Sequence, residues 1–155
     1  MLDVKKGLNK KVKLISDGGI KFSGDIAKAL AAGADAVMVG SMLAGTSEAP
    51  GKIIKKKSKL FKVFRGMGSV GAMNKGSADR YFQKKQKDKS KYVPEGVEGL
   101  IKYKGDVIKT IDKLVGGLRS SMGYLGAEQI KHLNKKAKFV KITKAGFYES
   151  MVHSI

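Results

Sequence analysis

The sequence contains no cysteine, no tryptophan and only two prolines. Without cysteine, these 155 residues cannot supply a disulfide, a zinc–thiolate site or a cysteine nucleophile. No apolar run reaches the roughly 18 residues of a membrane-spanning helix, and the opening MLDVKKGLNKK lacks the apolar stretch of a signal peptide. We therefore expect a cytoplasmic protein without membrane association, long enough for one domain with its own core.

Acidic residues are also scarce, since 13 Asp and Glu stand against 32 Lys and Arg for a formal net charge of +19. A charge of this size is typical of proteins that bind nucleic acids. However, Arg65, Arg80 and Arg119 are the only arginines, although bidentate recognition of phosphates and bases favours arginine. The lysines concentrate in residues 52–62 and 84–91, where solvated loops explain them more simply. Nucleic-acid binding therefore stays an alternative interpretation.

Residues 12–50 predict two strand–helix units. The apolar run VKLI (12–15) predicts a buried strand, and Ser23 is placed to cap a helix that stops at Gly33. The apolar face of that helix would hold Ile26, Ala27, Leu30 and Ala31. DAVMVG (35–40) predicts a second strand buried on both faces, followed by the short helical SMLAG (41–45). This order favours a parallel α/β sheet or barrel.

Two glycine-bearing turns, Asp17-Gly18-Gly19 and Gly40-Ser41, directly follow the predicted strands. In (βα)8 barrels, loops after the last two strands commonly hold a substrate phosphate through backbone amides. Asp17 suits a ribose diol, because a carboxylate accepts hydrogen bonds from two adjacent hydroxyls. Ordinary βα turns have the same composition, so the turns alone leave both interpretations open.

Beyond Pro50 the pattern changes. SKLFKVF (58–64) and VEGLIKY (97–103) predict a pair of strands that carry a long excursion. That excursion begins with FRGMGSVGAMNKGSADRYF (64–82), whose glycines indicate a mobile loop that lies close to a ligand. Asp106 is then predicted to open a long helix, followed by a helix in AEQIKHLNKKA and a strand-like KFVKIT.

Several separate motifs closely resemble the C-terminal part of the IMP dehydrogenase family, which oxidises inosine 5′-monophosphate (IMP) to xanthosine 5′-monophosphate (XMP) with NAD. They are, in order, LISDGGIKFSGDIAKALAAGADAVMVGSMLAGTSEAPG, FRGMGSVGAMNKGSADRYFQ, VPEGVEG and GGLRSSMGYLGA. The related GMP reductases share the barrel and the phosphate turns. The RGMGS loop followed by Asp79-Arg80-Tyr81-Phe82 resembles the dehydrogenase flap, and a GMP reductase-like fragment stays the alternative.

The resemblance implies an α/β fold that is the C-terminal portion of a (βα)8 TIM barrel. Residues 12–50 would be the last two βα units, residues 51–105 a long flap inserted on a β-ribbon, and residues 106–155 the C-terminal helices and tail. Together, residues 1–155 would form a single partial catalytic domain.

The resemblance also implies the role of each matching residue. Asp17 would bind the ribose hydroxyls, while Gly18, Gly19, Gly40 and Ser41 would cradle the phosphate. Gly66, Met67 and Gly68 would hold the hypoxanthine edge through the backbone, and Glu95 would face the base or the nicotinamide of NAD. Arg80 and Tyr81 would be the catalytic pair, on a flap that enters the vacated NAD site and activates the water that hydrolyses the covalent intermediate.

The tail carries further implied contacts. Tyr124 would lie near the NAD of a neighbouring protomer in a tetramer, and the backbone carbonyls of Glu149, Ser150 and Met151 would bind potassium. Two positions depart from the family pattern: Met151 replaces a usual histidine, and Phe64 replaces a tyrosine whose hydroxyl contacts the substrate phosphate.

The family attacks its purine with a cysteine on a loop ahead of the DGG strand. Because the sequence has no cysteine, we expect a C-terminal fragment that is inactive alone and needs the N-terminal half of the barrel.

Overall fold

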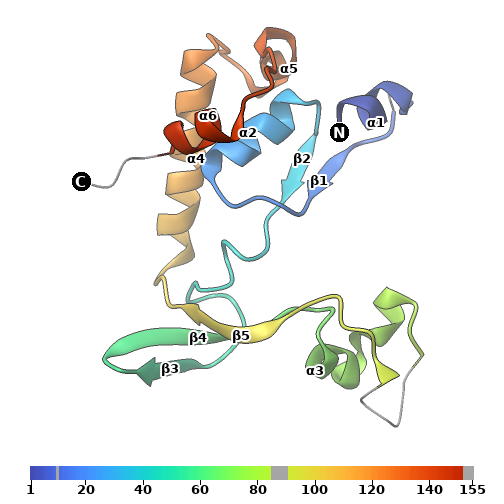
Figure 1. The fold of residues 1–155 in the computed structure, drawn as a ribbon, viewed down its shortest axis with the longest axis vertical. Coiled ribbons are helices and arrows are strands. Elements are labelled where there is room, and N and C mark those ends of the chain that lie inside the picture. Colours follow the sequence, from blue (N-terminus) through green and yellow to red (C-terminus); the bar gives the residue numbers. More distant parts are fainter. Residues whose placement is uncertain (10, 85–90, 152–155) are drawn as a thin grey trace.

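The chain folds into two lobes joined by residues 39–52 and by one long helix (Figure 1). The computed structural model describes residues 1–9, 11–84 and 91–151. One lobe holds the parallel strands and most helices, and the other holds an antiparallel sheet with the predicted flap at one end. No helix in the described ranges is long and apolar enough to span a bilayer.

The first lobe is built on a βαβ unit. Strand β1 (Ile15–Asp17) pairs in parallel with β2 (Ala36–Met38), and α2 (Ser23–Ala31) crosses between them. The helix is confirmed, but Ser23 is not its cap. Instead, the Asp25 carboxylate accepts the amides of Lys21 and Phe22, each at 3.0 Å.

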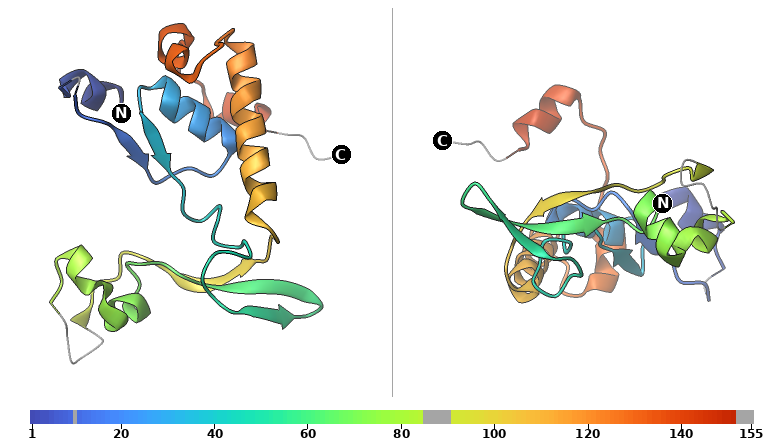
Figure 2. Two further views of the ribbon diagram at one scale, coloured as in Figure 1. Left: turned by 180° about the vertical axis from the view of Figure 1, so that it is seen from behind. Right: turned by 90° about the horizontal axis from the view of Figure 1, so that it is seen from below.

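Helix α4 (Val107–Tyr124) packs along α2 and encloses the core of this lobe (Figure 2). Ile20, Ile26 and Leu114 belong to one buried cluster, and Leu133 belongs to a second beside it. The predicted cap of this helix is confirmed, because the Asp106 carboxylate accepts the amide of Ile108 at 2.7 Å. Gly117 marks the crossing of the two helices, where a Cβ would overlap the side chain of Ser23.

The other face of the parallel strands is open to solvent. The in-register side chains Ile15 and Ala36 are exposed there, as are Asp17 and Met38. Ile15 is 54% exposed and Met38 51% exposed, so the prediction of strands buried on both faces is wrong for this chain. Only the α2 side of the pair is covered among the described residues.

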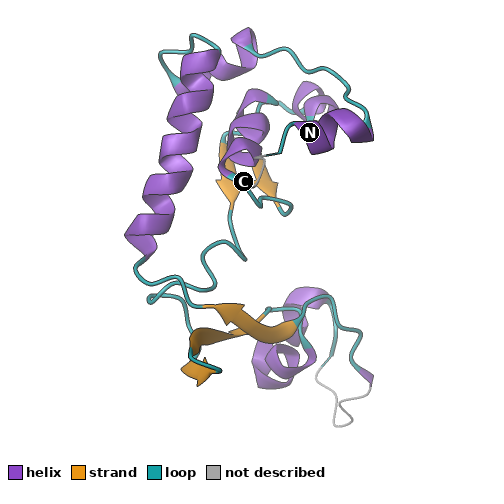
Figure 3. Ribbon diagram, turned by 60° about the vertical axis from the view of Figure 1, so that its left-hand side comes forward, coloured by secondary structure: helices purple, strands orange, loops and turns teal. Residues whose placement is uncertain are grey.

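The second lobe contains three strands rather than the predicted two. Strands β3 (Ile53–Lys56), β4 (Lys59–Arg65) and β5 (Glu98–Lys102) form an antiparallel sheet in the order β3-β4-β5 (Figure 3). The predicted pairing of the two apolar runs is confirmed, while β3 lies in a tract interpreted as solvated lysines. Its hairpin turn places Lys57 and Ser58 in the left-handed region, with φ of 46° and 62°.

The predicted flap lies at the end of this sheet, and the structure describes its residues 66–84 and 91–96. In place of an irregular loop, its described part has three short helical turns: α3 (Val70–Ala72), a π-helical turn (Met73–Ser77) and a 3₁₀ turn (Ala78–Tyr81). Met73, Ala78 and Tyr92 form a small buried cluster of their own. The flap therefore has an internal core in addition to its glycines.

The remaining elements are short. They are α1 (Leu2–Gly7), a 3₁₀ turn (Ile130–His132), α5 (Leu133–Lys136) and α6 (Lys144–Glu149). Residues 127–137 are thus less helical than predicted. The predicted helix at 41–45 is a series of turns, and the predicted strand KFVKIT is wrong, because residues 138–143 have no regular structure.

Candidate functional site

A cavity of about 750 Å³ lies between the two lobes, and we call it the two-wall pocket. The first wall is the segment that follows β2, and the second is the end of β4 with the start of the flap. The lining residues are Gly40, Ser41, Leu43, Ala44, Ala49, Pro50, Gly51, Lys52, Val63, Phe64, Arg65, Gly66, Met67, Lys75 and Glu98. The pocket brings together five sequence-predicted site residues that are far apart in the chain.

The first wall begins where β2 ends. Because β1 and β2 are parallel and Asp17 pairs with Met38, the Asp17-Gly18-Gly19 turn leaves the same edge of the sheet as Gly40 and Ser41. Gly18 and Gly19 have φ of 82° and 76°, a left-handed pair that favours glycine. These three residues are exposed and do not line the two-wall pocket.

The second wall presents Phe64, Gly66 and Met67. Phe64 is half-buried at the end of β4, and the Gly66 amide donates to the Val97 carbonyl at 2.9 Å. The Met67 carbonyl accepts the Ser77 hydroxyl at 2.6 Å, which ties this wall to the flap. Sequence reasoning missed this link and that of the Glu98 carboxylate, which accepts the Gly71 amide at 2.7 Å.

Gly68 and Glu95 meet at the base of the flap. The Gly68 carbonyl accepts the amides of Glu95 and Gly96 at 2.9 and 3.0 Å. A Cβ on Gly68 would lie 3.0 Å from Cζ of Tyr81 and 3.1 Å from the carbonyl carbon of Glu95. A side chain at position 68 would therefore crowd both Tyr81 and the backbone of Glu95.

The side chains of Arg80 and Tyr81 lie in different environments, one in solvent and the other against the flap core. Arg80 is exposed, and none of the ion pairs among the described residues involves it. The Tyr81 ring is half-buried against Met73, Ala78 and Tyr92. This position exposes a guanidinium while its neighbour anchors the turn.

Lys62 does not line the two-wall pocket but connects its two walls, and sequence reasoning missed this connection. Its side chain is 2% exposed, and its ammonium donates to the carbonyls of Thr46 at 2.6 Å and Ser47 at 2.7 Å. The sequence does hold a sign of this burial, because side chains alternate along a strand and Lys62 therefore lies on the same face of β4 as Leu60 and Phe64. A second ammonium, that of Lys104, donates to the Met42 carbonyl at 2.8 Å.

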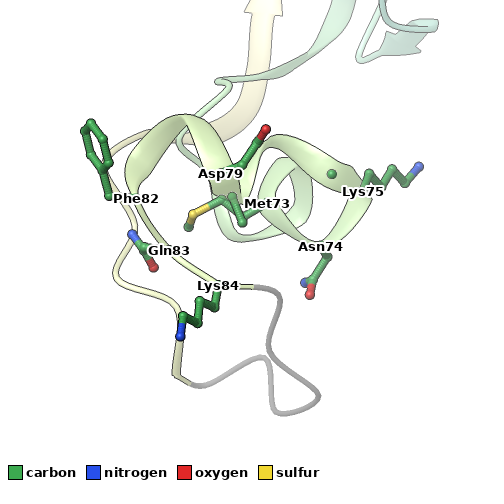
Figure 4. Close-up of a pocket in the computed structure, with 9 residues that line it drawn as sticks. Met73, Asn74, Lys75, Asp79, Phe82, Gln83 and Lys84 are labelled. Atoms are coloured by element: carbon green, nitrogen blue, oxygen red, sulfur yellow. The ribbon is translucent and has the colours of Figure 1, made fainter.

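A separate cavity of about 540 Å³ lies within the flap, lined by Met73, Asp79, Phe82, Gln83 and Lys84 among others (Figure 4). Phe82 is fully exposed with a φ of 55°, and the Gln83 amide bonds both the amide and the carbonyl of Val93. None of the predicted site residues lines this cavity. We therefore take the two-wall pocket as the candidate site.

The predicted cofactor and metal residues lie elsewhere. Tyr124 is 92% exposed at the end of α4 that points away from the antiparallel sheet, so the chain does not bring it near Glu95 (Figure 1). Glu149, Ser150 and Met151 are exposed at the C-terminal end of α6. The described residues contain no cluster of three or more His, Cys, Asp or Glu that could hold a metal ion.

In the described part of the chain, two carboxylates have a shifted pKa, and both stabilise the first lobe. The Leu14 amide and the Lys5 ammonium bond the Asp35 carboxylate and hold its pKa at about 2. For Asp25, burial alone would raise the pKa, but hydrogen bonds from Lys28 and the amides of Lys21 and Phe22 outweigh it and lower the pKa. Neither group lines the two-wall pocket.

Comparison with known proteins identifies the family. The model of the IMP dehydrogenase/GMP reductase domain matches residues 2–153. The chain belongs to this family. It is 58% identical over 142 residues to inosine-5′-monophosphate dehydrogenase of Bacillus subtilis and 57% identical over 145 residues to that of Aquifex aeolicus. These alignments cover 92% and 93% of the chain but only 28% and 29% of the two relatives.

A solved structure supports the α/β assignment. A GMP reductase variant from Trypanosoma brucei, in complex with guanosine 5′-monophosphate, superposes with a TM-score of 0.78 at 46% identity. The match covers 93% of this chain and 28% of that one. The chain thus spans less than a third of the length of these relatives.

Proposed function

We propose that the chain is the substrate-holding and flap portion of an IMP dehydrogenase, an enzyme of guanine nucleotide synthesis that converts IMP to XMP with NAD. The observation that carries this proposal is the convergence of Gly40 and Ser41 with Phe64, Gly66 and Met67 on one pocket. Family members named for IMP match almost the whole chain at more than half identity. The chain would form the last two βα units of a TIM barrel.

In this proposal, the two walls divide the nucleotide between them. Backbone amides near Gly19, after β1, and near Gly40 and Ser41, after β2, bind the phosphate, and the Asp17 carboxylate accepts the ribose hydroxyls. The loop at Gly66, Met67 and Gly68 faces the base. A ligand of this size bridges two segments that the two-wall pocket already places opposite each other.

The flap supplies the hydrolytic step. Arg80 is exposed on a turn whose neighbour Tyr81 is packed, so the guanidinium is presented by an anchored element. It would activate the water that hydrolyses the covalent purine intermediate. The cysteine of that intermediate must come from outside these 155 residues, which contain none.

Two groups are implied by the family, and the residues present fit them in part. NAD, when bound, accepts the hydride from the purine; the exposed Glu95 carboxylate would accept its hydrogen bonds, and the exposed Tyr124 ring would contact NAD of a neighbouring protomer in a tetramer. Potassium would take carbonyl oxygens of Glu149, Ser150 and Met151, a donor type that suits this ion. Three carbonyls are fewer than a full shell, so other chains would complete the site.

The second candidate is a GMP reductase portion, which the superposition on a guanosine 5′-monophosphate complex favours. Both activities bind a purine nucleoside 5′-monophosphate. The Arg80-Tyr81 pair supports the dehydrogenase, because only the dehydrogenase needs a water-activating flap.

The test is reconstitution with the part of the Bacillus subtilis enzyme that precedes the matched region. We expect the assembly to reduce NAD in the presence of IMP and potassium, and expect no turnover from either part alone. Oxidation of a reduced nicotinamide cofactor with GMP, and none with IMP, would instead identify a reductase. Tight, salt-sensitive binding of RNA with no nucleotide turnover would favour the nucleic-acid alternative.

A further inference from the structure

We infer that Lys62 is a positioning residue that fixes the separation between the two walls of the pocket. The inference rests on the proposed function only for its ligand. It combines the burial of the lysine, its two acceptors and the position of those acceptors in the opposite wall.

The first wall belongs to the segment that joins the lobes and the second wall to the antiparallel sheet and the flap, so their separation depends on contacts between them. The first wall runs from Gly40 to Lys52, and Thr46 and Ser47 lie inside that range. The second wall starts at Val63, the residue after Lys62 in β4. A lysine on one wall whose ammonium binds two carbonyls of the other therefore acts as a cross-brace.

The Lys62 ammonium is buried, so the loss of its hydrogen bonds would be costly. Thr46 is 1% exposed and Lys62 2% exposed, so bulk water cannot replace the bond to the Thr46 carbonyl, while Ser47 lies at the exposed side of the contact. The Thr46 hydroxyl donates to the Leu43 carbonyl at 2.8 Å, so the backbone of the first wall is also held in place on the side toward Ser41. Removing the ammonium leaves two carbonyl acceptors short of a donor.

Neighbouring contacts fix the remaining freedom of the first wall. The Val63 amide donates to the Lys52 carbonyl at 2.9 Å, and the Lys104 ammonium bonds the Met42 carbonyl at 2.8 Å. These contacts lie on either side of the Lys62 brace along the wall. Between Ala44 and Ala49, the Lys104 amide donates to the Gly45 carbonyl and the Ser47 amide to the Gly105 carbonyl, both at 2.8 Å, which ties this wall to the segment after β5. Lys62 ties the same stretch to β4.

The matched substitutions are Lys62→Met and Lys59→Met. Methionine keeps the length and apolar stem of lysine and removes the ammonium. Lys59 lies on the same strand, but it is exposed and pairs only with Lys56 across the hairpin. The absence of cysteine allows spin labels at Ser41→Cys and Met67→Cys, one on each wall, in the full 155-residue chain.

We expect a narrow label-to-label distance distribution in the Lys59→Met chain and a broadened or shifted one in the Lys62→Met chain. Superimposable distributions would overturn the inference. If Lys62→Met fails to fold, Lys62→Gln retains N–H donors and should give an intermediate broadening. A Lys62→Gln distribution identical to that of Lys59→Met would then be the contradicting result.

Nucleotide binding by the reconstituted assembly gives the functional readout. Lys62→Met should weaken IMP binding about tenfold, while inosine, which lacks the phosphate and so engages one wall, should change less than about twofold. Equal losses for both ligands would indicate general destabilisation and contradict positioning. If the unmodified assembly binds no IMP, the proposed function fails, and the label distances still decide the role of Lys62.

Discussion

At the residue scale, the flap depends on side chains that act in two different ways. Arg80 is exposed and carries the proposed chemistry, whereas Gly68 leaves space for Tyr81 and the backbone of Glu95 and Gly96 to approach closely. Phe64 lines the pocket, at a position where the resemblance implies a tyrosine in the family. Each of these residues can be tested by one substitution with a matched control.

Arg80→Ala in the reconstituted assembly should leave hydride transfer nearly intact and slow hydrolysis, because the proposed mechanism has the flap act after NADH has left. Rapid-mixing absorbance should show a burst of NADH followed by a slow steady state. Lys84→Ala, an exposed cation on the same flap, is the control and should retain the full steady-state rate. Loss of the burst in Arg80→Ala would refute the assignment.

Gly68→Ala should destabilise the flap, because the new methyl group would crowd Tyr81 and the backbone of Glu95 and Gly96. Overpacking of this kind costs about 1–3 kcal/mol. Gly99→Ala is the control, since a Cβ there meets nothing within 4 Å. Hydrogen exchange of the peptides from 66–84 measures the effect, and equal protection in both variants would rule out the close-approach argument.

Phe64→Tyr should tighten IMP binding, because the hydroxyl adds a donor for the phosphate. The gain should be about 1 kcal/mol, the net value of a typical hydrogen bond. Calorimetric titration of the assembly with IMP and with inosine separates the phosphate effect from general packing. An unchanged IMP affinity would show that this side chain does not face the phosphate.

At the element scale, the sequence predicted what is encoded locally. The helical spacing of apolar residues in α2 and α4 is a property of a short segment, and so is the Asp106 cap. The structure contains both helices and the cap. The strand β3 was missed because KIIKKK has the composition of a solvated loop, and its turn uses Lys57 and Ser58 in the left-handed region without glycine. Only pairing with β4 stabilises that strand.

The candidate site was predictable to a similar degree. Gly40, Ser41, Phe64, Gly66 and Met67 were named from motifs, and they meet in one pocket. The hydrogen bonds of Lys62 and Ser77 to backbone carbonyls were not predicted. Their acceptors are distant in sequence and carry no side-chain signature.

The contact between α1, β1 and β2 should make stability depend on acid pH through Asp35. Its pKa of about 2 lies below the usual value, so its stabilising effect is fully present above about pH 4 and is lost as the pH falls through about 2. Asp35→Asn should remove this effect at neutral pH. Asp3→Asn is the control, because that carboxylate is exposed and contacts only Lys6 at 3.7 Å.

Urea denaturation at several pH values measures this dependence. The unmodified chain and Asp3→Asn should lose stability together as acid is added, while Asp35→Asn should show a flatter profile. Parallel profiles for all three proteins would exclude Asp35 as the source.

At the scale of the whole molecule, the open face of the β1–β2 pair is the main liability of the chain. Ile15 and Met38 are about half exposed, and a two-stranded parallel sheet normally has both faces and edges covered. The isolated chain should therefore associate with increasing concentration. Sedimentation should show less association for Met38→Lys but not for Val97→Lys, a similarly exposed apolar residue outside the sheet.

The claim that two walls form one nucleotide site is tested most directly by hydrogen exchange of the reconstituted assembly with IMP, with inosine and without ligand. IMP should protect the peptides that contain Gly40-Ser41 and those that contain Phe64–Gly68 together, and inosine should protect only the second set. The claim would be contradicted if IMP left both sets unprotected, or if it protected only the lysine-rich hairpin of β3 and β4.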